Sequence, residues 1–167
     1  APWKPYQAFG RYGPHWDWRW IMDYSGGQLT DWAGHHVDIA HWALDLELTG
    51  PVEIEGRGKY PKDGIYDVPT EYKFTCKYEK GLTMIVANDR QQPHGMGTTW
   101  YGEKGWIYVN RDNILEAEPG SILDERIGPD EIRLYKNHDH HQNFIDCVKT
   151  RRPTITPAEI AHRSISV

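Results

Sequence analysis

A strict alternation of apolar and polar residues in the middle of the chain predicts a β-strand over residues 71–79. Alternate side chains of a strand point to opposite faces, so this pattern is typical of a sheet with one buried face and one solvated face. The residues expected on the buried face are Tyr72, Phe74, Cys76 and Tyr78. The turn-forming residues Glu79-Lys80-Gly81 then lead into an apolar run at 82–87, which completes a predicted antiparallel hairpin.

Other stretches with strand-like patterns lie on both sides of this hairpin. Residues 98–101 and 106–109 are joined by Gly102-Glu103-Lys104-Gly105, which predicts a second hairpin. Further strands are predicted at residues 52–59, where the strand is expected to be half exposed, and at 114–117 and 131–135. The polar, glycine-containing residues 88–97 between the two hairpins predict a surface loop.

Three segments have apolar residues spaced near the 3.6-residue period of a helix. They are residues 31–46, 137–149 and 156–167. Gly26 and Gly27 allow the chain to turn sharply into the first of these helices, or to approach a ligand closely. Asn137 is placed to cap the second, and Thr156 with Glu159 forms a predicted capping box at the start of the third.

Together the elements predict an α+β domain, with an open, mainly antiparallel sheet of about six strands and helices packed on one face. The length of 167 residues suits one domain with a single core. A net charge of -5 argues against a nucleic-acid surface and favours a neutral small-molecule substrate. No apolar run approaches the roughly 20 residues of a membrane span, so we expect a soluble protein. Its compartment is left open between the bacterial cytoplasm and the periplasm.

The helix predicted after Gly27 carries the main candidates for catalysis. At about 100° per residue, Asp31, His35 and Asp38 project from one face of an α-helix. An imidazole becomes a positioned proton acceptor when a carboxylate one turn away fixes its orientation. Asp31 and His35 are therefore the predicted catalytic residues, and the simpler alternative is a surface pair contributing a few tenths of a kcal/mol. His36 points toward the apolar side and is expected to be partly buried and hydrogen-bonded.

Aromatic residues before this helix predict the wall of a sugar-binding pocket. Residues 15–24 contain three tryptophans close to charged side chains, and aromatic faces stack on the C–H faces of sugars while charged groups bind hydroxyls. The predicted substrate-binding residues here are Asp17, Trp18 and Arg19, and the alternative is a cluster in the core or in an interface. Arg90 and His94 in the loop 88–97 are further candidates, although an ordinary β-connection is the favoured interpretation there.

The sequence predicts neither a metal site nor a cofactor site. His138, His140 and His141 radiate around a predicted helix, whereas zinc ligands must converge. No Gly-x-Gly-x-x-Gly follows a strand, so no residue is predicted to bind a dinucleotide. Cys76 and Cys147 are isolated, and two such cysteines do not form a disulfide framework.

The stretch from Gly26 to Asp38 resembles the signature of the Gfo/Idh/MocA family, the group of glucose-fructose oxidoreductase and inositol dehydrogenase. The matching features are the two glycines, Asp31, His35 four residues later and Asp38 three residues after that, together with the tryptophan-rich lead-in and the double histidine. In this family the aspartate and the first histidine sit in the sugar pocket. The histidine handles the hydroxyl proton while hydride passes to a nicotinamide cofactor. The resemblance implies these roles for Asp31 and His35.

The resemblance covers essentially the whole chain, but only the second domain of a family enzyme. It implies that residues 15–167 form a C-terminal substrate-binding domain and that residues 1–14 are a linker from an N-terminal Rossmann domain. NAD or NADP is then bound only in the complete enzyme, and the chain is expected to form a homo-oligomer through its sheet face. The implied function is the substrate-binding half of an NAD(P)-dependent oxidoreductase for a sugar, glycoside or cyclitol hydroxyl. The alternative is a non-redox carbohydrate-binding or hydrolase/lyase-like module.

Overall fold

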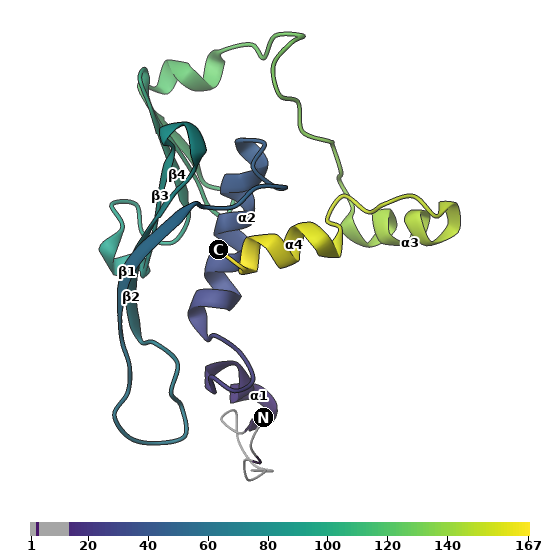
Figure 1. Cartoon of the computed structure of the whole chain (residues 1–167). Helices are drawn as coiled ribbons and strands as arrows, with labels where there is room; N and C mark the ends of the chain where they lie inside the picture. The colour runs from purple at the N-terminus through teal and green to yellow at the C-terminus, as the bar shows by residue number, and fades with distance from the viewer. Residues whose placement is uncertain (1–2, 4–13) are drawn as a thin grey trace. The chain divides into compact units, whose positions relative to one another are not determined.

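The computed structural model describes residue 3 and residues 14–167 (Figure 1). The predicted linker at residues 1–14 therefore lies almost entirely outside the described residues. The chain divides into two compact units. The first contains residues up to 36 together with 51–97, and the second contains residues 37–50 together with 98–167. Each unit thus combines two separate stretches of sequence.

The first unit contains a three-stranded antiparallel sheet in the order β1-β2-β3 (Figure 1). Its strands are β1 (Glu53–Lys59), β2 (Glu71–Lys77) and β3 (Thr83–Ala87). The alternation predicted in β2 is confirmed, because Tyr72 and Cys76 are buried while the flanking charged residues are exposed. Every residue of β1 is exposed, so this strand forms where predicted but lacks the buried face that was expected.

The described residues of the first unit also contain five short helical turns. They are α1 (Pro14–Asp17), η1 (Trp18–Trp20), η2 (Leu29–Ala33), η3 (Glu79–Gly81) and η4 (Asp89–Gln91). Helix α2 (Gly34–Ala43) follows η2 directly, and the boundary between the two units falls within it. The helix ends before the predicted residue 46, because Asp45 takes a left-handed φ of 54° and the Leu46 N–H donates back to the His41 carbonyl.

The second unit contains a three-stranded antiparallel sheet in the order β4-β5-β6. Its elements are β4 (Thr98–Gly102), β5 (Gly105–Val109), β6 (Leu115–Glu118), the turn η5 (Gly120–Asp124), α3 (His140–Thr150) and α4 (Ala158–Ile165). The second predicted hairpin is confirmed in β4 and β5. Its turn requires glycine at position 105, where φ is 146° and a Cβ would collide with the carbonyl oxygen of Glu118.

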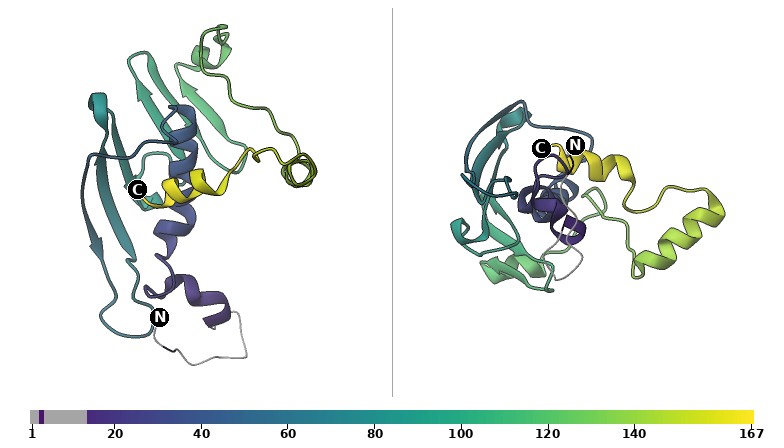
Figure 2. Two further views of the ribbon diagram at one scale, coloured as in Figure 1. Left: turned by 45° about the vertical axis from the view of Figure 1, so that its right-hand side comes forward. Right: turned by 90° about the horizontal axis from the view of Figure 1, so that it is seen from below.

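The strand predicted at residues 131–135 is not formed. Residues 125–139 contain neither helix nor strand, and Figure 2 shows an extended connection leading to α3. Polar groups of this segment bond locally instead of to a neighbouring strand. The Arg133 guanidinium donates to the carbonyl oxygen of Ile127 at 2.9 Å, and the Glu131 carboxylate accepts from the Gly128 N–H. Alternating apolar residues are therefore not sufficient to form a strand here, because no partner strand pairs with them.

Both helix caps predicted near the end of the chain are wrong in detail. The N-cap of α3 is Asp139, whose carboxylate accepts from the Gln142 N–H at 2.9 Å, and not Asn137. The N-cap of α4 is Pro157, which has no side chain able to cap, so the predicted box with Thr156 is absent. Glu159 pairs instead with Arg163 one turn later.

The α+β class with antiparallel strands is confirmed, although the six strands form two separate three-stranded sheets instead of one. Cys76 and Cys147 are both free thiols. Among the helices of the described residues, none combines the length and the apolar character that crossing a membrane requires.

The cap of α3 gives a first testable prediction. Asp139→Ala should lower the free energy of unfolding by about 1 kcal/mol, because the Gln142 N–H loses its acceptor. Asn137→Ala is the matched control, because Asn137 accepts only a long hydrogen bond, from the Asp139 N–H at 3.4 Å. Urea denaturation of the two variants measures the difference. Equal losses in both variants would return the capping role to Asn137.

Candidate functional site

The approach to the candidate site is a tight turn at Gly26 and Gly27. Gly27 is buried and has a φ of 66°, which residues with a Cβ rarely adopt. A Cβ on Gly27 would lie 2.6 Å from Cγ2 of Val68. The neighbouring Gly26 N–H donates to the Thr30 hydroxyl at 3.1 Å. The sharp turn predicted from the two glycines is therefore confirmed, and η2 follows it directly.

The turn η2 is a five-residue π-helical segment that contains Asp31. Its hydrogen bonds run from residue i to i+5, so the angle between successive side chains is smaller than in an α-helix. The projection of 100° per residue used to align Asp31 with His35 does not apply across this segment. No hydrogen bond joins Asp31 to His35 among the described residues, so the expected direct pair is not formed.

Asp31 pairs instead with Arg19. The Nε atom of Arg19 lies 3.6 Å from Oδ2 of Asp31, and 24% and 44% of the two side chains are exposed. This distance is longer than a good charge-assisted hydrogen bond, so the interaction is an electrostatic pair in partial contact with solvent. The carboxylate keeps acceptor capacity for a further donor such as a hydroxyl group.

The guanidinium of Arg19 also lies over three indole rings. Its carbon atom is 5.0 Å from the ring centre of Trp16, 5.7 Å from that of Trp18 and 5.2 Å from that of Trp20. Each distance is within the range of a cation–π interaction. Trp16 and Trp18 are exposed. The tryptophan-rich segment thus forms an accessible aromatic surface around a cation that reaches Asp31.

His35 and His36 differ in their surroundings, as predicted. His35 lies in the first turn of α2, is exposed, and packs edge-on against Trp32 with ring centres 6.2 Å apart. His36 is half-buried, and both of its ring nitrogens are shielded from solvent. His35 is therefore the member of the pair that a substrate can reach.

Asp17 is placed differently from its predicted neighbours. It is buried, and its carboxylate accepts a hydrogen bond of 2.8 Å from the Tyr66 hydroxyl. This hydrogen bond, with burial and the negative charge of Asp17, raises the pKa of Tyr66. The next residue, Asp67, accepts from the Met22 N–H at 2.7 Å and donates its own N–H to the Trp20 carbonyl. The arrangement favours an anchoring role for Asp17.

The two loop candidates lie away from these contacts along the chain. Arg90 is in η4, is exposed, and its N–H donates to the Asp89 carboxylate at 2.8 Å. His94 follows in the same loop and is half-buried. A cation–π contact and an ion pair join Trp18, Arg19 and Asp31 into one group, and the hydrogen bonds and ion pairs of the described residues do not link Arg90 to it.

Sequence reasoning missed the residues that hold the tryptophan segment in place. Tyr66 and Asp67 are separated from it by more than forty positions, as in the contact between Met22 and Asp67, and no local pattern marks them. Trp32 was noted only as part of the helix signature, and its packing on His35 depends on the π-helical turn.

The described residues do not form a metal or dinucleotide site. No group of three or more His, Cys, Asp or Glu side chains in the described part of the chain is arranged to hold a metal ion. The glycines nearest to a fingerprint, Gly56 and Gly58, lie inside strand β1, where no helix N-terminus is available for a pyrophosphate. A nicotinamide cofactor therefore does not fit the described residues.

Comparison with known proteins gives one family match. A family model described as the GFO/IDH/MocA C-terminal domain matches residues 6–108, which is more than half of the chain. The matched region includes the glycine turn, η2, α2 and the first sheet. No curated protein matches the chain.

The Tyr66–Asp17 hydrogen bond gives the second prediction. Tyr66→Phe should lower the free energy of unfolding by about 1–3 kcal/mol at neutral pH, because the buried Asp17 carboxylate loses a donor. Tyr60→Phe is the control, since Tyr60 is exposed and the change should cost less than about 0.5 kcal/mol. Urea denaturation at several pH values measures both.

The pH dependence of this difference has a defined sign. The raised pKa of Tyr66 means that the folded protein holds the phenolic proton more tightly than the unfolded chain does. The stabilisation is present below the unfolded tyrosine pKa of about 10 and is lost as the pH rises through the folded value. The gap between wild type and Tyr66→Phe should therefore shrink above about pH 10. If the difference in free energy of unfolding between wild type and Tyr66→Phe stayed constant or grew above this pH, the result would contradict the hydrogen bond.

Proposed function

Because the chain belongs to the GFO/IDH/MocA family as its C-terminal domain, we propose that it is the substrate-binding and catalytic half of an NAD(P)-dependent oxidoreductase. The proposed substrate is a sugar, glycoside or cyclitol with a secondary hydroxyl group to be oxidised. The proposed domain extends over residues 15–167. The cofactor would be held by an N-terminal Rossmann domain, because the residues of this chain do not fit it.

The substrate class is inferred from the group formed by Trp18, Arg19 and Asp31. Sugars present C–H faces that stack on indole rings and hydroxyls that bond to charged groups. The exposed Trp18 ring supplies such a face. Asp31, neutralised in part by Arg19, supplies an acceptor for a hydroxyl without leaving an uncompensated charge in the site.

His35 is the proposed proton acceptor. Oxidation of a secondary alcohol removes a proton from the oxygen and a hydride from the carbon, and a nicotinamide held by the proposed Rossmann domain would accept the hydride. The exposed imidazole of His35 can take the hydroxyl proton, and its packing against Trp32 restricts the ring. Asp31 would then orient the substrate hydroxyl, and it would not orient the imidazole of His35. Arg90 and His94 are further proposed contacts of substrate hydroxyls.

The third prediction tests the base in the full-length enzyme. His35→Ala should lower kcat by about 100- to 10,000-fold, the usual contribution of a general base. The acid limb of the pH–rate profile, where a protonated base cannot accept a proton, should disappear in the same variant. Steady-state kinetics across pH measures both effects.

His36→Ala serves as the control for His35→Ala. Because His36 is half-buried and its ring nitrogens are shielded, its loss should lower thermal stability and leave the acid limb in place. If His35→Ala kept a near-normal kcat and an unchanged acid limb, the base would have to be another residue. A substrate that is cleaved without change in oxidation state would favour the hydrolase or lyase alternative.

The fourth prediction concerns the cofactor. The isolated 167-residue chain should bind NAD or NADP no more tightly than millimolar, because its sequence has no Gly-x-Gly-x-x-Gly fingerprint leading from a strand into a helix. The full-length protein should bind one of the two cofactors more tightly by orders of magnitude. Isothermal titration calorimetry compares the two proteins, with circular dichroism as the check that the isolated chain is folded. Micromolar binding to the isolated chain would place the cofactor site within these residues.

A further inference from the structure

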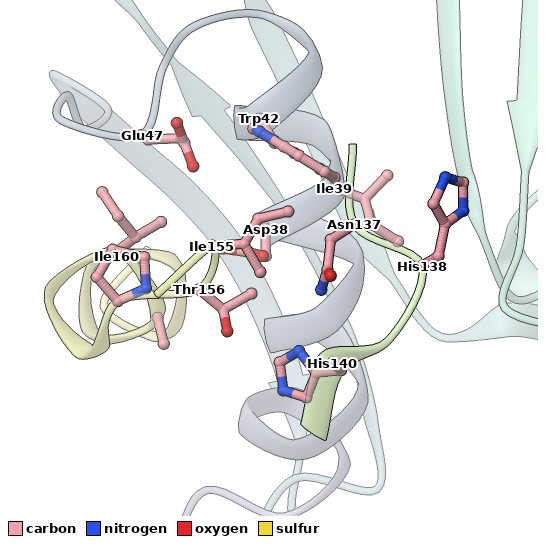
Figure 3. A pocket seen from close by; sticks show the side chains of 12 residues that line it. Asp38, Ile39, Trp42, Glu47, Asn137, His138, His140, Ile155, Thr156 and Ile160 are labelled. Atoms are coloured by element: carbon pink, nitrogen blue, oxygen red, sulfur yellow. The ribbon is translucent and has the colours of Figure 1, made fainter. Parts of the chain in front are cut away.

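The second unit contains a pocket that is separate from the proposed catalytic residues. Its volume is about 380 Å³, near the lower end of the range for small-molecule sites. Helix α2, the residues before α3 and the start of α4 supply the walls (Figure 3). The lining residues used below are Asp38, Trp42, Glu47, Asn137, His140 and Ile160. Neither Asp31 nor His35 is among the residues that line it.

Two carboxylates face this pocket from the same stretch of chain. Asp38 lies on α2, and Glu47 lies just after the end of that helix. Both are half-buried. Oδ1 of Asp38 accepts a hydrogen bond of 2.7 Å from the Ser164 hydroxyl of α4, which fixes the carboxylate. Its second oxygen, Oδ2, has no hydrogen-bond partner among the described residues and can accept from a ligand.

The basic side chains that line the pocket are two histidines, His138 and His140. None of the lining residues is Lys or Arg. The ion pairs of the described residues involve neither Asp38 nor Glu47, nor the neighbouring Asp45. Burial raises the pKa of Glu47, and the charges of Asp38 and Asp45 raise it further. Half-buried like charges of this kind are destabilising, and a bound cation would relieve them.

The remaining lining favours an organic cation over a metal ion. The described residues contain no group of three or more side chains placed to hold a metal. Trp42 offers an indole ring, and Ile160 is one of several aliphatic side chains on the walls. Figure 3 shows Glu47 beside the Trp42 side of the pocket, with Asn137 and His140 on another side. A ligand can thus place an ammonium group at the carboxylates and an apolar body against the walls.

We propose that this pocket binds a small molecule that carries a protonated amine on a compact apolar body. The carboxylates of Asp38 and Glu47 hold the ammonium group. Trp42 and the isoleucine side chains cover the apolar body. The site is independent of the proposed oxidoreductase activity, because none of the residues assigned to that activity lines it.

Titration of the full-length protein with benzylamine tests the proposal, with benzyl alcohol as the neutral analogue of similar shape. Saturation-transfer NMR measures both affinities. Benzylamine should bind saturably and at least about tenfold more tightly than benzyl alcohol, since hydrogen bonds to charged groups are worth about a tenfold change or more. Glu47→Gln should weaken benzylamine binding about tenfold while leaving benzyl alcohol unchanged.

Asp45→Asn is the matched control. It removes a negative charge that acts on Glu47 from outside the pocket lining, so benzylamine affinity should fall clearly less than the tenfold loss expected for Glu47→Gln. Asp38→Asn should also weaken benzylamine binding about tenfold, provided that this variant folds. If it does not fold, the test rests on Glu47→Gln. Absence of saturable binding, equal affinity for the alcohol, or an equal effect of Asp45→Asn would overturn the proposal.

Discussion

The guanidinium of Arg19 is the group on which the candidate active site depends. It lies over the rings of Trp16, Trp18 and Trp20 and reaches the carboxylate of Asp31. The aromatic segment alone would be a flat surface with no polar group to orient a substrate. Asp31 alone would be an exposed charge at a π-helical turn. Because one planar cation stacks on aromatic faces and pairs with a carboxylate at the same time, it joins the two into one recognition surface.

Sequence alone predicted the elements whose cause is local. Strand β2 follows from the alternation that buries Tyr72 and Cys76, and its hairpin follows from a turn that the backbone at Lys80 and Gly81 can make. The glycine turn before η2 was predictable for the same reason, since a φ of 66° at Gly27 favours glycine. The contrast between His35 and His36 needed only the difference of about 100° between adjacent helical residues.

Other features depend on partners far along the chain, which no local pattern contains. Asp17 is predicted to bind substrate, and its carboxylate also accepts a hydrogen bond from Tyr66 in a distant loop. Asp31 lies in the π-helical turn Leu29–Ala33 and pairs with Arg19, twelve positions earlier, and the sequence has no signal for either feature. The stretch 131–135 had the alternation of a strand, but a strand forms only where another strand is free to pair with it.

Asp31 and Asp38 belong to one sequence motif, but their charged neighbours differ. Asp31 has Arg19 beside it, so its carboxylate can accept from a neutral hydroxyl without attracting a cation strongly. Asp38 shares its surroundings with Glu47 and Asp45, and the pKa of Glu47 is raised first by burial and then by the negative charges of Asp38 and Asp45. A neutral ligand would leave the repulsion between these charges in place, whereas an ammonium group would reduce it. The number of carboxylates in the motif does not distinguish the surroundings of Asp31 from those of Asp38. The presence of Arg19 beside Asp31 does.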